Sequence, residues 1–287
     1  MADAVDVIDD AEHSRFLYVE DGQEAQLAYR AEDGRLVLTH TEVLPGCEPW
    51  RVEGGPHGAL VLHGFTGCPQ SVRPLAEAFA AAGFAVEMPL LPGHGTTVDD
   101  LVLTGWPDWA AAAEQAYERL AARTERVVVA GLSAGGTLTA WLAAHHEVAG
   151  IVCVHPLIGV DEDLLSAVRG MLDEGTDRID AIGGDIADPE GHEVGYDATP
   201  LGPLLSLAEG AAAVRDDLGR ITCPALLLTS AEDHVVPPSN SDVLAAGLGG
   251  PVERVRLERS YHVATLDHDR ELIAERAVEF ARRVTTA

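Results

Sequence analysis

The chain has 287 residues, of which 47 are acidic and 19 basic, and its formal net charge at pH 7 is −28. This charge argues against nucleic acid and anionic membrane surfaces as partners, because both would repel an acidic protein. Hydrophobic residues make up 47% of the chain, which excludes global disorder and provides for a large buried core. The length suits one large α/β domain with an insertion, or two small domains.

The N-terminal part of the chain is expected to lie outside the main domain. Residues 1–14 are acidic, and we expect a disordered tail there. Three β-rich runs follow, RFLYVE, EAQLAYR and RLVLTHTEV, separated by the turn signals DGQ and AEDG. They predict a small antiparallel β meander over residues 15–46. The meander resembles the first strands of small acetyltransferase domains, but the glycine-rich loop that holds coenzyme A there is missing, which favours a structural appendage.

Three features of the sequence indicate the cellular compartment and the membrane association to expect. The first residues lack the basic and apolar regions of a signal peptide, and no apolar run reaches the roughly 20 residues that cross a bilayer. The four cysteines, Cys47, Cys68, Cys153 and Cys223, form no CxxC pair and show no regular spacing, and we expect all four to be reduced. We therefore expect a soluble, cytoplasmic protein without stable membrane insertion. The sequence does not define its oligomeric state.

From residue 47 onward, apolar strands alternate with helices. The runs GALVLHG, AVEMPL, RVVVAG, GIVCVHP and PALLLTS are typical of strands, and helical patterns lie between them. Such alternation indicates a mostly parallel sheet with helices on both faces. It breaks at about residues 157–215, where Leu- and Ala-rich helical pieces flank a Gly/Asp-rich middle. We expect an α/β domain over residues 47–287, with a small inserted cap at 157–215.

The segment GLSAG lies between a predicted strand and a predicted helix and fits the pattern G-x-S-x-G. In this motif a strained turn exposes the serine hydroxyl at the edge of the sheet, and the two glycines are required because the turn is crowded. The helix N-terminus beside the serine favours negative charge. These features predict that Ser133 is a nucleophile rather than a helix-capping serine.

A serine nucleophile needs a histidine base and an acid that orients the base, and here they follow in the order Ser, acid, His. His262 follows the predicted strand VERVRL, in a short loop before the last helix, and is the predicted base; His268 is the weaker alternative. Asp233 lies just past the strand PALLLTS and is the predicted acid. Glu232 is the near alternative to it, and Asp267 could at most cap the following helix.

The tetrahedral oxyanion of acyl transfer needs N–H donors. We predict that one is the backbone N–H of Ala134, directly after the serine, and that the other is the N–H of Phe65 in the loop LHGFTG. His63 and His94 are expected to fix their loops. No metal site is predicted, because HVATLDHD lacks a matching cluster of ligands, and no GxGxxG or P-loop indicates a cofactor.

Five motifs in chain order, LVLHGFTG, LPGHG, VAGLSAGG, EDHVVPP and SYHVATLD, resemble those of the bacterial carboxylesterase and monoacylglycerol lipase family of α/β-hydrolases. The resemblance extends from about residue 49 to residue 281. It implies an α/β-hydrolase fold and hydrolysis of carboxylic esters under an apolar cap, without a cofactor. It agrees with the site residues that the motifs indicate: Ser133, Asp233, His262, Phe65 and Ala134. The chain departs from the family in the N-terminal meander and in the Gly/Asp-rich middle of the cap.

The sequence thus predicts a serine esterase whose substrate is a small-molecule ester with a short- to medium-chain acyl group. The flanks of the cap, LIGVDEDLLSAV and PLLSLAEGAAAV, could turn Leu and Val side chains toward the serine, while the polar middle would stay in water. An acyltransferase or thioesterase on the same three residues is the alternative, and a non-catalytic binding protein on this fold is a further one. Dehalogenases and epoxide hydrolases are excluded, because they need an aspartate at position 133.

Overall fold

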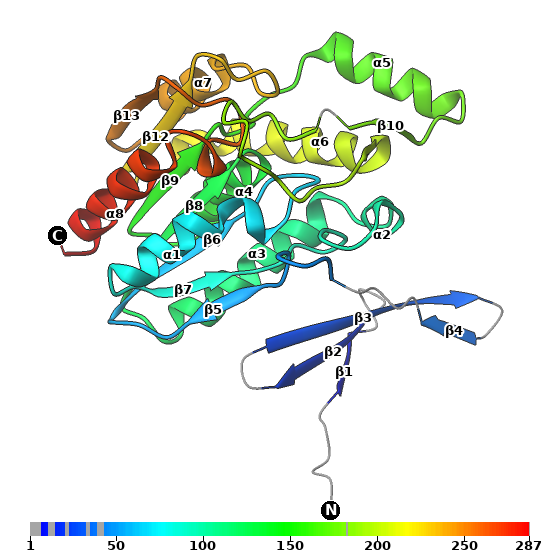
Figure 1. Cartoon of the computed structure of the whole chain (residues 1–287), viewed down its shortest axis with the longest axis horizontal. Helices are drawn as coiled ribbons and strands as arrows, with labels where there is room; N and C mark the ends of the chain where they lie inside the picture. Colours follow the sequence, from blue (N-terminus) through cyan, green and yellow to red (C-terminus); the bar gives the residue numbers. More distant parts are fainter. Residues whose placement is uncertain are drawn as a thin grey trace, which may run out of the picture.

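A computed structural model describes residues 43–181 and 183–286 in full and, before them, the backbone of four strands (Figure 1). These strands pair antiparallel in the order β1-β2-β3-β4: β1 (Val7–Asp10), β2 (Arg15–Glu20), β3 (Gln23–Glu32) and β4 (Arg35–Leu38). The last three correspond to the three β-rich runs of the sequence. β1 lies in the segment for which the sequence predicts a disordered tail, and its backbone pairs with that of β2.

The main domain is built on a seven-stranded sheet in the order β13-β12-β9-β8-β6-β7-β5. The strands are β5 (Trp50–Val52), β6 (His57–Leu62), β7 (Ala85–Met88), β8 (Arg126–Leu132), β9 (Gly150–Val154), β12 (Ala225–Ser230) and β13 (Val252–Leu257). All neighbouring strands pair in parallel except β5, which runs antiparallel to β7 at one edge. Because helices cover both faces, the central strands are continuous apolar runs rather than alternating ones. The predicted α/β architecture is confirmed.

Helices cover both faces of the sheet (Figure 1), and two hydrophobic clusters of buried side chains form the core. Helices α1 (Arg73–Ala81) and α8 (Arg270–Thr286) pack on one face, where Phe79 and Phe280 are fully buried. Helices α3 (Trp106–Ala121) and α4 (Ala134–His145) pack on the other face. Two further helices are α2 (Val98–Val102) and α7 (Ser239–Gly247), and the short 3₁₀ segments are η2 (Pro69–Val72), η3 (Leu218–Arg220) and η4 (Ala264–Leu266).

The chain between β9 and β12 forms the insertion. It contains α5 (Glu162–Asp173), the antiparallel pair β10 (Arg178–Asp180) and β11 (Ala198–Pro200), and α6 (Leu201–Asp217). In Figure 1, α5 lies far from the sheet, whereas α6 packs on α3 and α4. Leu207 and Val214 of α6 belong to the core of the main domain. Helix α6 therefore belongs to the helical layer on the sheet as well as to the cap. Its apolar side chains Leu207 and Val214 are used in the core of the main domain.

The prediction that all four cysteines are reduced is wrong for one pair. Cys47 and Cys68 form a disulfide that joins the segment before β5 to the loop after β6, and both are buried. Cys153 and Cys223 are free. Sequence spacing could not identify the pair, because only the fold brings residues 21 positions apart within reach of one another. By the chain-entropy estimate, closing a loop of this length stabilises the folded state by about 3 kcal/mol.

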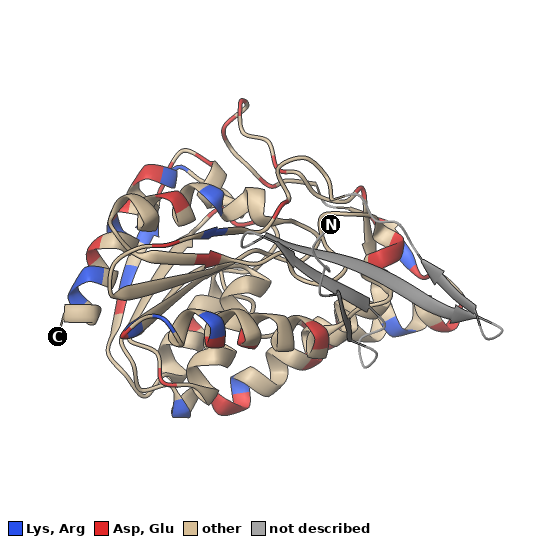
Figure 2. Ribbon diagram, turned by 90° about the horizontal axis from the view of Figure 1, so that it is seen from below, with Lys and Arg blue, Asp and Glu red and all other residues tan. Residues whose placement is uncertain are grey.

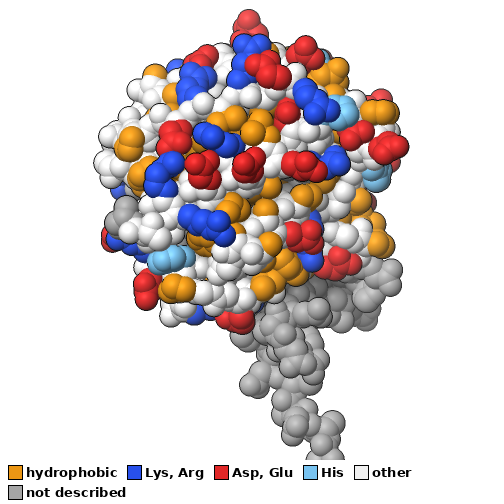
Figure 3. Space-filling model, turned by 60° about the vertical axis from the view of Figure 1, so that its left-hand side comes forward, with side chains coloured by type: hydrophobic (Ala, Val, Ile, Leu, Met, Phe, Trp, Pro, Cys, Tyr) orange, Lys and Arg blue, Asp and Glu red, His pale blue; other side chains and the backbone are white. Residues whose placement is uncertain are grey.

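Charges of both signs are interspersed on the surface in spite of the net charge. Figure 2 shows arginine and acidic residues along the helices and loops on both sides of the sheet, and Figure 3 shows them alternating on one face of the molecule. Exposed pairs include Arg254 with Asp242 and Arg73 with Glu77. None of the described helices combines the length and the apolar character needed to span a bilayer.

Candidate active site

Ser133 occupies the turn between β8 and α4. Its backbone, with φ 55° and ψ −118°, lies in the positive-φ region, which costs a residue with a side chain about 1–3 kcal/mol. The turn is crowded: a Cβ atom at Gly131 would lie 2.1 Å from the carbonyl oxygen of Gly135, and one at Gly135 would lie 2.2 Å from that of Leu62. Only glycine fits at either position, as the motif predicts. The turn leaves the Ser133 side chain partly exposed at the carboxyl edge of the sheet.

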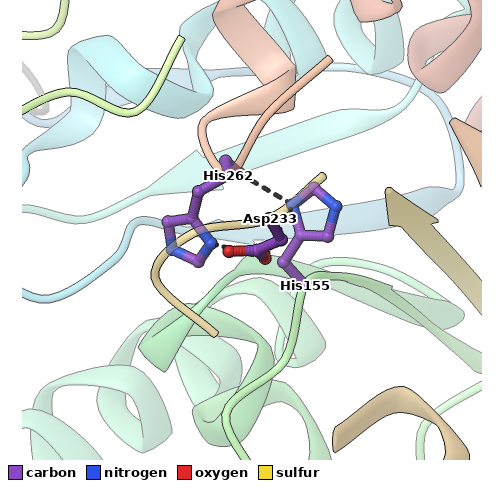
Figure 4. A group of neighbouring side chains, drawn as sticks. All are labelled: His155, Asp233 and His262. Atoms are coloured by element: carbon purple, nitrogen blue, oxygen red, sulfur yellow. Dashed lines mark hydrogen bonds and ion pairs between the residues drawn. The ribbon is translucent and has the colours of Figure 1, made fainter. Parts of the chain in front are cut away.

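The predicted acid and base lie in neighbouring loops. Strands β12 and β13 pair in register, with Ser230 opposite Leu257, so the loops that follow them lie side by side. Asp233 is in the first loop and His262 in the second, and His262 Nδ1 is 2.8 Å from Asp233 Oδ2 (Figure 4). The other carboxylate oxygen accepts hydrogen bonds from the N–H groups of two following residues at 2.9 and 2.8 Å. The loops thus hold the acid against the base.

The Asp233 carboxylate keeps its charge although its side chain is only 1% exposed. Burial alone would raise the pKa of Asp233, but the hydrogen bond and charge of His262, together with the neighbouring His155 and a backbone N–H, hold this pKa below its ordinary value. An ionised carboxylate can stabilise the imidazolium that forms when the base takes up a proton. Glu232, the alternative acid, is exposed, and no hydrogen bond joins its carboxyl group to His262 within the described ranges.

The serine is anchored by its backbone rather than by its hydroxyl. The N–H of Ser133 donates to the carbonyl oxygen of Val154 at 2.9 Å. Gly64 faces the serine side chain. A Cβ atom added at position 64 would lie 3.4 Å from the Cβ of Ser133. In the part of the chain that the structure describes, no hydrogen bond joins Ser133 Oγ to His262. Such bonds are often long in free enzymes and shorten when substrate binds, so this geometry is compatible with a serine–histidine pair.

The two predicted oxyanion donors lie in different segments: Ala134 directly follows the serine, and Phe65 follows Gly64, whose position faces the serine side chain. Ala134 is the first residue of α4, so its N–H has no acceptor in a preceding helical turn. Phe65 lies in the loop after β6, and its ring packs on those of Trp109 and His94, with centroids 5.6 and 6.1 Å away. His63 fixes this loop: its Nδ1 bonds to the carbonyl oxygen of Gly64 at 2.9 Å, and its Nε2 accepts from a backbone N–H at 3.1 Å. This is the structural role expected for His63.

Glu193, in the cap, is a residue of the site region that sequence reasoning missed. A Cβ atom at Gly67 would lie 2.9 Å from Glu193 Oε1, so the carboxyl group lies against the loop that carries Phe65. Burial raises the pKa of Glu193 to about 7, and the nearby His262 opposes the rise. At neutral pH this group can therefore donate or accept a hydrogen bond. It lies in the Gly- and acid-rich run PEGHEVGYD, which is typical of a solvated loop, so no sequence signal identified it.

The middle of the cap, which the sequence predicts to stay in water, is exposed or half-buried at each described residue from 183 to 197, and it also makes polar contacts with the main domain. Asp185 accepts hydrogen bonds from the backbone N–H groups of His262 and His234, both at 3.1 Å, and its other oxygen bonds to the His234 ring at 2.8 Å. Asp267 is fully buried and accepts N–H bonds from Ala187 and Asp188 of the cap and from two residues of its own loop. Asp267 therefore anchors the cap, and the cap contacts the loop that carries the predicted base.

One cluster of potential metal ligands occurs among the described residues: His155, Asp233 and His262, with ligand atoms within 4.8 Å of one another. The His155 Nε2 accepts a hydrogen bond from the backbone N–H of Ser230 at 2.8 Å. Its Nδ1 must then carry the ring proton, and it lies 2.7 Å from the carbonyl oxygen of His262. Neither nitrogen has a free lone pair, so this set fits a hydrogen-bonded network better than a metal site.

Comparison with known proteins identifies the class. Residues 59–276 match the Alpha/beta hydrolase family, and because this is more than half of the chain, the protein belongs to that family.

Individual relatives define the activity. The chain is 46% identical over 242 residues to a thermostable monoacylglycerol lipase from Bacillus sp. (strain H-257), covering 83% of this chain and 95% of the relative. It is 27% identical over 241 residues to a carboxylesterase from Bacillus subtilis (strain 168), covering 83% and 97%. A solved structure described with the metagenome-derived lipolytic enzymes LipS and LipT has a TM-score of 0.81 at 41% identity, covering 84% of this chain and all of the other. The chain is therefore a carboxylic ester hydrolase of the serine type.

Buried neutral histidines make the stability of the protein depend on pH. Burial lowers the pKa of His63 to about 3 and those of His94 and His155 to about 4. In the unfolded chain these groups titrate near pH 6.5. Between pH 6.5 and about 4 the unfolded chain therefore binds more protons, and the free energy of unfolding should fall as the pH falls, by at most about 4 kcal/mol per pH unit. Glu193 and Glu87, whose pKa values are raised by burial, offset part of this slope.

Urea unfolding measured from pH 4.5 to 7 checks this expectation. His94→Asn, which retains a donor toward the carbonyl oxygen of Pro92, should reduce the slope near pH 5 by about 1 kcal/mol per pH unit, the contribution of one proton. His145→Asn, at an exposed position, is the matched control. An unchanged slope in His94→Asn would contradict the assignment of a buried neutral ring.

Proposed function

We propose that Ser133 is the nucleophile, His262 the general base and Asp233 the orienting acid of this ester hydrolase. The observation that carries the proposal is the 2.8 Å contact between His262 Nδ1 and Asp233 Oδ2, at the same edge of the sheet as the strained Ser133 turn. A bond at Nδ1 leaves Nε2 of His262 as the nitrogen that can accept the serine proton. The order Ser, acid, His along the chain matches the α/β-hydrolase arrangement.

The reaction then runs in two halves. Ser133 Oγ attacks the ester carbonyl while His262 takes the hydroxyl proton, and the N–H groups of Phe65 and Ala134 hold the oxyanion. As the intermediate collapses, the C–O bond to the alcohol breaks and His262 protonates the leaving oxygen. Water, deprotonated by the same histidine, next attacks the acyl-enzyme and releases the carboxylic acid and free Ser133. Throughout, the charge of Asp233 stabilises the imidazolium.

We further propose that the acyl group is short to medium in length. Leu207 and Val214 of α6 pack into the main core, so the cap keeps only a limited apolar surface for an acyl chain. The alcohol is proposed to be polar, because the carboxyl group of Glu193 lies beside the oxyanion loop and can bond to free hydroxyl groups. A monoacylglycerol has both properties, and the 46% identical relative is a monoacylglycerol lipase.

The cellular compartment of the protein is still only predicted. The cytoplasmic location predicted from the sequence is weakened by the Cys47–Cys68 disulfide, because disulfides persist mainly in oxidising compartments.

Substitution of the three proposed residues tests the proposal. Ser133→Ala should lower kcat by about 10⁴- to 10⁶-fold in a folded protein, as expected when the nucleophile of such a triad is removed. Asp233→Asn should lower kcat by roughly 10²- to 10⁴-fold, because the imidazole loses its orienting acceptor. Glu232→Gln, one residue away and exposed, is the matched control and should retain the wild-type rate. If Glu232→Gln lost more activity than Asp233→Asn, the assignment of the acid would be wrong.

A substrate series tests the proposed specificity. The kcat/KM for p-nitrophenyl esters should rise a few-fold per added carbon, since each buried methylene contributes about 0.8 kcal/mol, and should stop rising at roughly eight to twelve carbons. Glu193→Ala, which removes the hydrogen-bonding group, should raise KM for monoacylglycerols and leave KM for p-nitrophenyl esters unchanged, because only the former carry hydroxyl groups on the leaving alcohol. All substrates must stay below micelle-forming concentrations. A flat profile, or a maximum at acetate, would show that the cap does not bind the acyl chain.

A further inference from the structure

His155 is a buried histidine between the elements that carry the proposed catalytic residues. It directly follows β9, which lies between β8, ending beside Ser133, and β12, which precedes Asp233. The residue is 2% exposed, and its backbone φ is 46°, a value that few non-glycine residues adopt. Such strain persists where the surroundings hold a residue in place, and it is concentrated at functional sites.

The ring of His155 is held in one tautomer. Its Nε2 accepts the backbone N–H of Ser230 at 2.8 Å, so the ring proton is on Nδ1. Nδ1–H donates to the carbonyl oxygen of His262 at 2.7 Å (Figure 4). Burial lowers the pKa of His155 to about 4, with His262 as the next cause, so the ring is neutral at neutral pH. A neutral ring leaves the charge of Asp233 available to His262.

The loop that carries His262 depends on contacts from outside itself. His262 lies in an irregular segment between β13 and η4. Its N–H donates to Asp185 of the cap at 3.1 Å, and its carbonyl oxygen accepts from His155. The two imidazole rings stack, with centroids 5.6 Å apart and planes inclined by 25°. The backbone of His262 is thus held on both sides, and His155 holds the carbonyl side.

We propose that His155 is a positioning residue, whose Nδ1–H bond to the His262 carbonyl keeps the imidazole aligned between Asp233 and Ser133. The inference rests on the proposed function, because it takes His262 as the base. Displacement of a reacting group by about 1 Å can cost 100-fold in rate, so loss of this bond should lower kcat and leave KM almost unchanged. A purely structural role, in which His155 only satisfies two buried backbone groups, would lower stability without changing the chemistry.

Two amide variants separate the two hydrogen bonds. In His155→Asn the side-chain N–H₂ can take the place of Nδ1 and keep the bond to His262, and asparagine tolerates positive φ. In His155→Gln the amide oxygen can take the place of Nε2 and keep the bond to Ser230. We expect His155→Gln to lower kcat by roughly 10- to 100-fold at unchanged KM, and His155→Asn to rescue most of that loss.

The pH profile distinguishes positioning from stability. The acid limb of kcat/KM reports the pKa of the base in the free enzyme. If His155→Gln loosens the contact between His262 and Asp233, the imidazolium is less stabilised and this limb should move to lower pH, whereas His155→Asn should restore it. Two other titratable groups act on these histidines: Asp185, whose charge acts on His155 and which accepts the backbone N–H of His262, and Glu193, which interacts with His262. Both stay unchanged in the two variants.

Three results would overturn the inference. The first is a His155→Gln variant whose kcat, and whose acid limb of kcat/KM, equal those of the wild-type protein. The second is an equal loss of kcat in both variants, in proportion to the fall in their melting temperatures, with the acid limb of kcat/KM at its wild-type pH. The third needs no variant: ¹⁵N NMR of the wild-type protein at neutral pH should show the His155 proton on Nδ1, and a proton on Nε2 would contradict the proposed bond. If Ser133→Ala retained activity, the proposed function would fail instead, whatever the His155 variants do.

Discussion

The parallel pairing of β8, β9, β12 and β13 is the constraint on which the site depends. In a parallel sheet the carboxyl ends of all strands meet at one edge, so the residues that follow these four strands converge there. Ser133, His155, Asp233 and His262 come from four segments far apart in the chain, and each lies within five residues of the end of its strand. A slip in the register of β12 against β13 would move Asp233 out of reach of His262.

The cap takes part in the site through backbone contacts as well as through the space that it covers. Asp185 bonds to the N–H of His262, and Asp267 bonds to the N–H groups of two cap residues. These charge-assisted hydrogen bonds tie the cap to the loop of the proposed base. Displacement of the cap would therefore change the position of His262 as well as the binding of substrate. Glu193 adds a polar group against the loop that carries Phe65.

The features that follow from local rules could be predicted from the sequence. The turn at Ser133 needs glycine on both sides because of its own crowding, so the motif identifies it, and the apolar runs identify the strands that carry Asp233 and His262. The disulfide, the hydrogen bonds of Asp185 and the contact of Glu193 with the loop after β6 depend on segments that are far apart in the sequence and meet only in the fold. His155 stands at the end of an apolar strand like any strand-terminal residue. Its role depends on the ends of two other strands, which no local pattern specifies.

Covalent labelling of the serine tests the central claim most directly. Incubation of the wild-type protein with a fluorophosphonate should attach one phosphonyl group per chain. Intact-mass measurement should detect this group, and peptide mapping should locate it on Ser133. The labelling rate should fall steeply in His262→Ala, because the hydroxyl loses its base, and Ser133→Ala should take up no label. A label on another residue, or an unchanged labelling rate in His262→Ala, would contradict the account of Ser133 as a nucleophile activated by His262.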